Sequence, residues 1–317
     1  MTTADQRIIV TGAGGYLGGR VSAELDGRVA AIVRRSVPWL PSDAQTVGDL
    51  LEPDDDLLDA FADASAVIHL AGHNEVLART EPDRARDETV AATQTVIDAA
   101  QANGIRRVVY VSTIHVYGEH LVPGATIDER TEAAPVSAYA EARAACESLL
   151  LDASALDPVV LRLSNAVGAP ADPSVDRWTL VASELSRDAV LDQTMVLRSP
   201  GLQTRDFITV SDASRIAVES CAGTVPGGVY NLASGHSISI RDLAHVIGDR
   251  VEERYGHRPT LEAPPADDEP EEPYTFDVSA LAAHGIRAEQ PIRVGIDELI
   301  DHCRKHRTQL HATRGTT

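Results

Sequence analysis

The chain has 317 residues, enough for one large α/β domain or for one domain with a smaller lobe. Its 28 basic and 48 acidic residues leave a formal net charge of −20, and such a surface repels phosphate backbones and argues against nucleic-acid binding. Three widely spaced cysteines, Cys146, Cys221 and Cys303, exclude a disulfide scaffold and a cysteine-rich zinc site, and we predict no metal site.

The sequence also shows no feature of a membrane or secreted protein. No apolar run approaches the roughly 20 residues that cross a bilayer. The opening residues, MTTADQRIIVTGAGG, lack the basic and apolar regions of a signal peptide. We therefore expect a soluble, cytoplasmic protein that does not bind membranes.

Short apolar runs alternate with longer amphipathic stretches through the first 165 residues. The runs are rich in Val and Ile, as expected of strands buried on both faces, and predict strands over residues 7–11, 29–34, 66–71, 108–112 and 159–163. The amphipathic stretches predict helices over residues 16–25, 57–62, 82–103 and 138–151. Strands alternating with helices predict a doubly wound parallel sheet, which binds ligands along the edge formed by the carboxyl ends of its strands.

After Pro170 this alternation weakens, and prolines and glycines become frequent. We assign residues 1–169 to the sheet domain and residues 170–300 to a smaller lobe that is interleaved with late strands of the sheet. Residues 263–273 read APPADDEPEEP, an acidic, proline-rich loop. Residues 301–317 are polar and partly basic, and we expect a flexible tail there.

A glycine-rich turn follows the first predicted strand. The sequence TGAGGYLGG places glycines at 12, 15 and 18: Gly12 allows the tight turn, Gly15 lets the backbone approach a pyrophosphate, and Gly18 lets the next helix pack closely on the sheet. Phosphates then lie at a helix N-terminus, where free N–H groups and the helix dipole favour anions. Placed between a strand and a helix, this pattern predicts a Rossmann-type dinucleotide-binding turn; the alternative is an ordinary glycine turn.

Further motifs follow in a fixed order along the chain. They are VGDL (47–50), VIHLAG (67–72), TVAATQTVIDAA (89–100), RRVVYVSTIHVYG (106–118), LRLSNAVGAP (161–170), QTRDFITVSD (203–212) and GGVYNLASG (227–235). With the glycine turn, they resemble the extended short-chain dehydrogenase/reductase family, which comprises nucleotide-sugar epimerases, dehydratases and ketoreductases. The resemblance covers roughly residues 5–300.

This resemblance implies an NAD(P)-dependent enzyme with a nucleotide-sugar or related sugar substrate. It also implies a homodimer formed through helices 82–103 and 138–151, although the small residues of these helices suit packing within one chain equally well. The implied contacts with the dinucleotide are Gly12, Gly15, Tyr16, Leu17, Gly18, Asp49, Leu50, Leu70, Ala71, Gly72, Tyr139 and Arg143.

The end of the second predicted strand bears on the choice of cofactor. An acidic residue there binds the ribose 2′-hydroxyl of NAD, whereas an Arg accommodates the 2′-phosphate of NADP. The acidic position corresponds to Val33, and Arg34 and Arg35 follow it. We expect a preference for NADP(H), with NAD(H) remaining open. The alternative is that one or both arginines point into solvent.

Family oxidoreductases use a Ser or Thr together with a Tyr-x-x-x-Lys motif, and this chain departs from that pattern. The resemblance assigns Thr113 to orient the substrate carbonyl and Tyr139 as the acid/base. Arg143 occupies the lysine position, and the only lysine of the chain is Lys305. Residues 139 and 143 share one helix face, so Arg143 still places a positive charge beside Tyr139. A working variant and a weakened or lost active site both remain open.

Neighbouring residues narrow the chemistry. Family dehydratases carry carboxylates at the positions that Ile114 and His115 occupy here. We therefore do not expect dehydration. The reactions that remain open are reduction of a sugar carbonyl and epimerisation through a transient ketone. His115 is either an extra acid/base or a hydrogen-bonded wall residue. Asn165 and Arg205 match family residues that contact the substrate diphosphate. The alternative for Arg205 is an ion pair with an aspartate, Asp206 or Asp212.

We therefore predict an NAD(P)-dependent oxidoreductase that reduces a nucleotide-linked keto-sugar, with Tyr139 as the acid/base. Two alternatives remain. One is an NAD-dependent nucleotide-sugar 4-epimerase. The other is a dinucleotide-binding protein with weakened or no catalysis, because Arg143 replaces the usual lysine.

Overall fold

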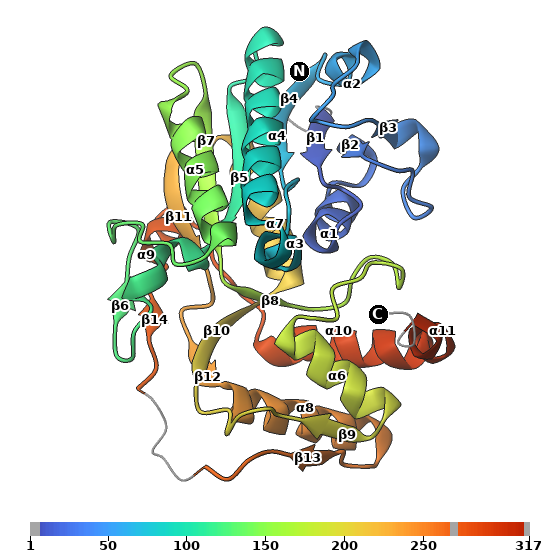
Figure 1. Ribbon diagram of the computed structural model, residues 1–317. Helices are drawn as coiled ribbons and strands as arrows, with labels where there is room; N and C mark the ends of the chain where they lie inside the picture. The colour runs from blue at the N-terminus through green and yellow to red at the C-terminus, as the bar shows by residue number, and fades with distance from the viewer. Residues whose placement is uncertain (1–6, 267–271, 314–317) are drawn as a thin grey trace.

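The computed structural model describes residues 7–266 and 272–313 (Figure 1). Its largest feature is a seven-stranded sheet in the order β11-β7-β5-β4-β1-β2-β3, in which every neighbouring pair is parallel. The strands are β1 (Arg7–Thr11), β2 (Val29–Val33), β3 (Gln45–Val47), β4 (Ala64–His69), β5 (Arg107–Thr113), β7 (Asp157–Leu163) and β11 (Gly228–Leu232). Because the strand order reverses direction at β1, with β2 on one side and β4 on the other, the predicted doubly wound Rossmann-type sheet is confirmed.

Five of these strands match the predicted runs with ends shifted by two residues or fewer. The sequence analysis missed β3 and β11. β3 has only three residues, and none of them is fully buried, so it lacks the apolar run that marks the other strands. β11 lies in the part of the chain where the alternation of strands and helices weakens, and it pairs with β7 across a long sequence separation.

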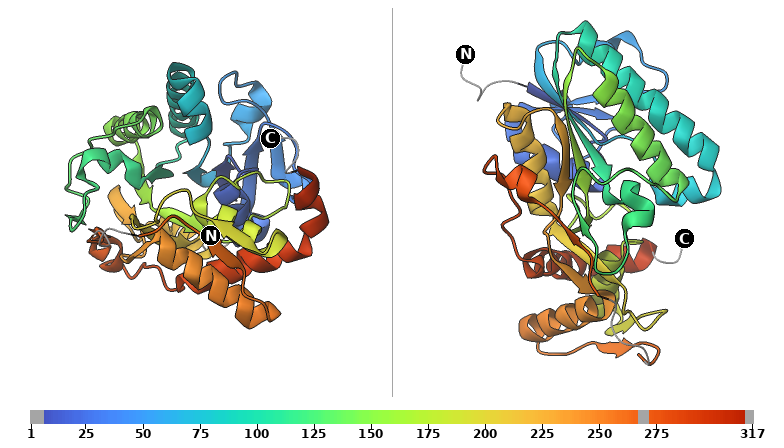
Figure 2. Two further views of the ribbon diagram at one scale, coloured as in Figure 1. Left: turned by 60° about the horizontal axis from the view of Figure 1, so that its bottom comes forward. Right: turned by 90° about the vertical axis from the view of Figure 1, so that its left-hand side faces the viewer.

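Helices cover both faces of the sheet, as Figures 1 and 2 show. On one face lie α3 (Glu75–Thr80), α4 (Pro82–Ala102) and α5 (Ala138–Asp152), and on the other lie α1 (Tyr16–Leu25), α7 (Val210–Glu219) and the short α9 (Ser279–Ala282). Because successive side chains of a strand point to opposite faces, β1 contributes to the apolar core on each side of the sheet. Ile8 and Val10 pack on the α1 side, whereas Ile9 packs on the α4 side. Within the described residues, no helix is long and apolar enough to cross a membrane.

A second lobe lies below the carboxyl edge of the sheet in Figure 1. Its helices are α6 (Val181–Leu191), α8 (Ile240–Tyr255) and α10 (Ile292–Lys305), which share an apolar core that includes Leu185, Leu243 and Ile296. Its small sheets are formed by β8 (Asn165–Val167), β10 (Thr204–Thr209) and β12 (Ser237–Ser239), by β9 (Thr194–Val196) and β13 (Thr260–Glu262), and by β6 (Thr126–Ile127) and β14 (Thr275–Phe276). The remaining short helices are α2 (Asp55–Asp59) and four 3₁₀ turns (Asp26–Arg28, Ser42–Ala44, Ile114–His120 and Ser220–Ala222).

The chain passes between the two lobes more than once. After β10 it returns to the sheet domain, where α7 packs against α1 and β11 forms the sheet edge beside β7. The expectation of a flexible tail from residue 301 is wrong for residues 301–313, because α10 continues to Lys305 and α11 (Arg307–Thr313) follows. Cys303 and Leu310 hold this segment in place, since both are buried in the core of the second lobe. Residues 314–317, and residues 267–271 of the acidic loop, lie outside the described ranges.

Candidate active site

The glycine-rich turn joins β1 to α1 at the carboxyl edge of the sheet. The Gly15 amide donates to the Gly12 carbonyl at 2.9 Å, which closes the turn, and Gly15 is the residue immediately before α1. Gly18 packs so closely on the turn that a Cβ atom there would lie 2.1 Å from the Gly12 carbonyl oxygen. The N-terminus of α1 therefore faces the sheet edge with bare backbone, which is the arrangement that a pyrophosphate requires.

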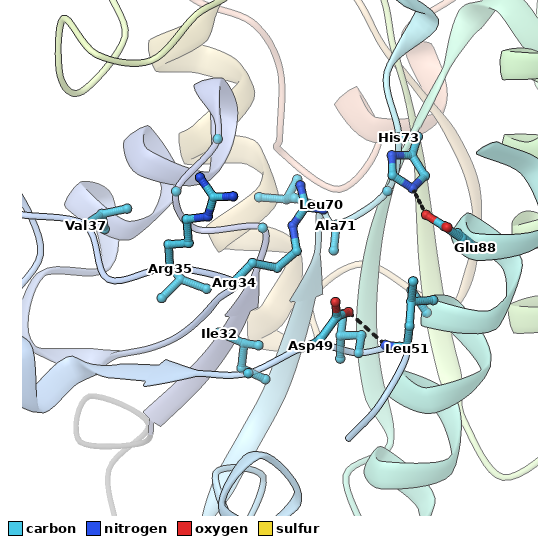
Figure 3. A pocket seen from close by; sticks show the side chains of 18 residues that line it. Ile32, Arg34, Arg35, Val37, Asp49, Leu51, Leu70, Ala71, His73 and Glu88 are labelled. Carbon is cyan, nitrogen blue, oxygen red and sulfur yellow. Dashed lines mark hydrogen bonds and ion pairs between the residues drawn. The ribbon is translucent and has the colours of Figure 1, made fainter. Parts of the chain in front are cut away.

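A cleft of about 760 Å³ opens beside this turn (Figure 3). Nine of the predicted cofactor contacts line it, namely Gly12, Gly15, Arg34, Arg35, Asp49, Leu50, Leu70, Ala71 and Gly72. It spans the ends of β1, β2 and β4, the point where the strand order of the sheet reverses. The fold therefore places these residues where doubly wound sheets bind a dinucleotide.

Five predicted cofactor contacts do not line this cleft: Tyr16, Leu17 and Gly18 at the start of α1, and Tyr139 and Arg143 on α5, which are described below. The Tyr16 hydroxyl donates to the Gly168 carbonyl at 2.6 Å, so it ties α1 to the second lobe, and burial raises its pKa well above the ordinary value. Leu17 packs against the core between α1 and the sheet, and Gly18 contacts the turn itself. These three residues shape and support the cleft rather than form its wall.

Arg34 and Arg35 lie on one side of the cleft, directly after β2 (Figure 3). Both side chains are exposed, and within residues 7–266 and 272–313 neither forms an ion pair with a carboxylate. Their backbone neighbour Val33 also lines the cleft, so the position where NAD-binding folds carry an acidic residue is apolar here. Two free guanidinium groups beside a dinucleotide cleft suit an additional phosphate.

The opposite side of the cleft carries a pair that the sequence analysis missed. His73 Nε2 and Glu88 Oε2 lie 2.5 Å apart, and Arg84 binds the other carboxylate oxygen at 2.7 Å. The hydrogen bond from Arg84, followed by that from His73, lowers the pKa of Glu88. Glu88 and Ala92 both line the cleft from α4. The signal in the sequence for this shared position is their spacing of four residues, which places them on one helix face.

The predicted catalytic residues lie on β5 and α5, which pack together beside this cleft. Thr113 is buried at the end of β5, and its hydroxyl accepts the His115 amide at 3.3 Å. Tyr139 and Arg143 share one face of α5, and the guanidinium carbon of Arg143 lies 5.3 Å from the centre of the Tyr139 ring. Arg143 also contacts Gly72 at the cleft wall, because a Cβ atom on Gly72 would lie 3.2 Å from both of its terminal nitrogens. The structure thus places Arg143 beside Gly72 of the cleft wall and Tyr139 beside Arg143.

Behind these residues lies a buried ion pair. Glu147, two turns beyond Tyr139 on α5, binds Arg162 of β7 at 2.7 Å and accepts the Ser112 hydroxyl of β5 at 2.5 Å. Both charged side chains are less than a tenth exposed. The pair therefore links α5 to two adjacent strands and fixes the helix that carries Tyr139 against the strand that carries Thr113.

The predicted substrate residues lie between the two lobes. Arg205 of β10 donates to the Thr204 carbonyl at 2.8 Å and lies near His115 and Tyr274. The alternative of an ion pair for Arg205 is not observed among the described residues. Asp206 instead accepts bonds from Ser164 and from the 234–236 turn, and Asp212 binds Arg215.

His115, in the 3₁₀ turn that follows β5, and Asn165, on β8, lie beside this region. Partial removal from water and the charge of Arg205 lower the pKa of His115, whereas Glu75 acts in the opposite direction. Because the neutral form of His115 is favoured, its ring is able to accept as well as donate a hydrogen bond. Asn165 of β8 donates its amide to the Asp206 carbonyl at 2.8 Å, which joins β8 to β10.

The fold and this site together define a Rossmann-type dinucleotide-binding enzyme. The model of the NAD dependent epimerase/dehydratase family matches residues 8–233, and the chain belongs to that family. It is accordingly an NAD(P)-dependent enzyme of the extended short-chain dehydrogenase type.

Individual relatives differ in the reaction that their names describe. The chain is 30% identical over 257 residues to the GDP-6-deoxy-D-mannose reductase of Pseudomonas aeruginosa, covering 77% of this chain and 80% of the reductase. It is 27% identical over 271 residues to the UDP-glucose 4-epimerase of Rhizobium leguminosarum bv. trifolii, covering 77% and 82%. The structure of MoeE5 in complex with UDP-glucose and NAD matches with a TM-score of 0.77 and 27% identity, over 94% of this chain and 99% of that one. Family membership thus leaves reduction, epimerisation and dehydration to be separated by the site.

Proposed function

We propose that the protein is an NADP(H)-preferring reductase that acts on a nucleotide-linked keto-sugar. The observation that carries the proposal is the pair of exposed guanidinium groups, Arg34 and Arg35, that line the cleft after β2. Arg presents a planar fork of donors that matches phosphate oxygens, so these side chains suit the 2′-phosphate of NADP. The similarity to the reductase of P. aeruginosa supports reduction as the reaction.

The nicotinamide ring, when bound, supplies the hydride. In this proposal the Tyr139 hydroxyl donates a proton to the substrate carbonyl oxygen, and Thr113 orients the same oxygen by a hydrogen bond. The carbonyl thus gains one hydride and one proton and becomes an alcohol. Arg143 keeps a permanent positive charge beside Tyr139 and offers further N–H donors to ribose hydroxyls.

The second lobe would hold the nucleotide part of the substrate. Arg205 lies free of carboxylate partners among the described residues, and Asn165 lies on the adjacent strand β8. A guanidinium group with unused donors suits a diphosphate, and a neutral His115 nearby suits a sugar hydroxyl. Reversal of charge at Arg205 is therefore expected to raise the KM for the nucleotide-sugar more than it lowers kcat.

The cofactor part is tested by direct binding. The double variant Arg34→Ala/Arg35→Ala is expected to lose about tenfold or more of its NADPH affinity, since each bond to a charged group contributes about 1.5–3 kcal/mol. Its NADH affinity should not change. Arg198→Ala is the matched control, because Arg198 is also exposed but lies on the second lobe beside Glu184. Equal losses for NADPH and NADH, or equal wild-type affinities, would refute the assigned preference.

The reaction is tested with a panel of nucleotide-linked keto-sugars, by following NADPH oxidation. Tyr139→Phe is expected to lower kcat by about 10²–10⁴-fold, the usual contribution of a general acid. Tyr230→Phe is the control, because Tyr230 loses only a hydroxyl that donates to the Pro226 carbonyl at the sheet edge. Unchanged turnover in Tyr139→Phe would show that another group delivers the proton.

The similarity to the UDP-glucose 4-epimerase favours a second candidate, in which the alcohol is first oxidised and the ketone is then reduced from its other face. An epimerase retains its cofactor through the cycle. NAD that stays bound through purification, together with interconversion of C4 epimers without added cofactor, would therefore select this candidate. The expected homodimer through α4 and α5 stays a prediction, which the mass in solution tests.

A further inference from the structure

Arg143 is held in the candidate active site by contacts that fix the plane of its guanidinium group. Its guanidinium group is buried, with only 7% of the residue exposed. Its guanidinium carbon lies over two aromatic rings, 5.9 Å from the centre of Tyr110 and 5.3 Å from the centre of Tyr139. Tyr139 is on the same helix, whereas Tyr110 comes from β5, the strand that ends at Thr113.

Two hydrogen bonds set the plane of this guanidinium group. One terminal nitrogen donates to the Tyr110 hydroxyl at 3.3 Å, and the other donates to the His73 carbonyl at 3.4 Å. Because the guanidinium group is a rigid planar fork, two bonds at different nitrogens fix both its position and its orientation. An ammonium group on a flexible stem has no plane to fix, so a lysine here would depend less on either partner.

Tyr110 is itself held rigidly in the core. It is fully buried and stacks on His69 at 5.4 Å, with an angle of 29° between the rings. His69 is anchored at both ring nitrogens, 2.7 Å from the Thr11 hydroxyl and 3.0 Å from the Thr93 hydroxyl. Burial raises the pKa of Tyr110 well above its ordinary value, so the phenol stays neutral and its oxygen accepts from Arg143.

The held guanidinium group reaches the dinucleotide cleft through Gly72. That residue lines the cleft, and a Cβ atom there would approach both terminal nitrogens of Arg143 to 3.2 Å. The missing side chain at Gly72 therefore leaves room for the terminal nitrogens of Arg143 beside the cleft wall. Tyr110 is fully buried and does not line the cleft, so an effect of its hydroxyl on a bound dinucleotide has to pass through a neighbour such as Arg143.

We propose that Tyr110 is a positioning residue that aligns the Arg143 guanidinium group with the ribose of the bound dinucleotide, and that this chain depends on it because an arginine replaces the family's lysine. The proposal rests on the proposed function only in that the cleft binds a nicotinamide dinucleotide. It concerns how this chain's own side chains present donors to that ligand. It predicts that the Tyr110 hydroxyl matters only while residue 143 is an arginine.

The test is a double-mutant cycle read by dinucleotide affinity. The dissociation constants for NADPH and NADP⁺ are measured by calorimetry and nicotinamide fluorescence for the wild type, Tyr110→Phe, Arg143→Lys and the double variant. In the wild-type background, Tyr110→Phe is expected to weaken binding about tenfold, the loss that corresponds to one hydrogen bond of a charged group. In the Arg143→Lys background, the same substitution is expected to change the affinity less than about twofold.

Tyr117→Phe is the matched control. Tyr117 is also fully buried and also lies against a guanidinium group, that of Arg162 at 4.6 Å, and its hydroxyl donates to Asn231 at 2.6 Å. Its loss therefore removes a comparable hydroxyl from a comparable site that does not contact Arg143. Melting temperatures of all variants show whether each one is folded at the temperature of the assay.

Three results would overturn the proposal. The first is a folded Tyr110→Phe variant with wild-type affinity, the second is an equal loss of affinity in Tyr117→Phe, and the third is a tenfold loss that persists in the Arg143→Lys background. The mutant cycle measures binding directly. A wild type that binds NADPH but reduces no keto-sugar would therefore refute the proposed reaction, while the test of Tyr110 would remain valid.

Discussion

Replacing Glu147 by Gln tests the energetics of the site, because it removes one charge of the buried pair that joins α5 to the sheet. Arg162 would keep its position on β7 with only a neutral partner. One of its terminal nitrogens, Nη1, is buried and already has no hydrogen-bond partner among the residues that the structure describes. The substitution nearly preserves volume, so no cavity complicates the result. What changes is the electrostatic balance around a guanidinium group that is only 7% exposed.

The expected cost follows from that burial. Removing one member of a buried ion pair costs about 3–5 kcal/mol, since the remaining charge is desolvated without compensation. A chain of 317 residues unfolds with an entropy of about 0.7 kcal/mol per kelvin, at about 2.1 cal/mol/K for each residue. Glu147→Gln should therefore lower the melting temperature by about 4–7 °C.

The assay is calorimetric unfolding at neutral pH, with Glu253→Gln as the control. Glu253 also pairs with an arginine, Arg250, but 62% of its side chain is exposed and Arg250 keeps a second partner in Asp297. An exposed pair contributes about 0–1 kcal/mol, so the control should shift the melting temperature by less than about 2 °C. If both variants shift it equally, burial does not set the energy of the Glu147–Arg162 pair.

Two further predictions address the turn and the core behind it. Gly18→Ala places a Cβ atom 2.1 Å from the Gly12 carbonyl oxygen, so calorimetry should show at least about tenfold weaker dinucleotide binding, whereas Gly27→Ala, which meets nothing within 4 Å, should bind normally. Burial, followed by the charge of Arg143, lowers the pKa of His69 to about 3 from its ordinary 6.5. Between these values only the unfolded chain binds the proton, so stability falls by about 1.4 kcal/mol for each pH unit below 6.5. Urea unfolding at about pH 7 and about pH 5 should show a smaller difference for His69→Gln than for the wild type, and an equal difference would contradict the assignment.

Local patterns were sufficient for the framework of the molecule. Each buried strand, the glycine turn and each flanking helix could be recognised from a few neighbouring residues. This is possible because the apolar run of a strand and the periodicity of a helix are properties of contiguous sequence. The spacing of Tyr139 and Arg143 likewise placed both on one helix face before any contact was known. The parallel direction of the strands then followed from the alternation of strands and helices.

The sequence by itself therefore determined that a dinucleotide-binding turn and a Tyr–Arg pair exist. Only the tertiary structure decided what surrounds them, because the partners are remote in the chain: Arg143 meets Tyr110 and His73, which lie 33 and 70 positions away. The same holds for the His73–Glu88 pair at the cleft and for the terminal helix that Leu310 anchors in the second lobe. Side chains that meet only after the lobes and layers have packed leave no periodic trace in the sequence, so their pairing is visible only in the folded chain.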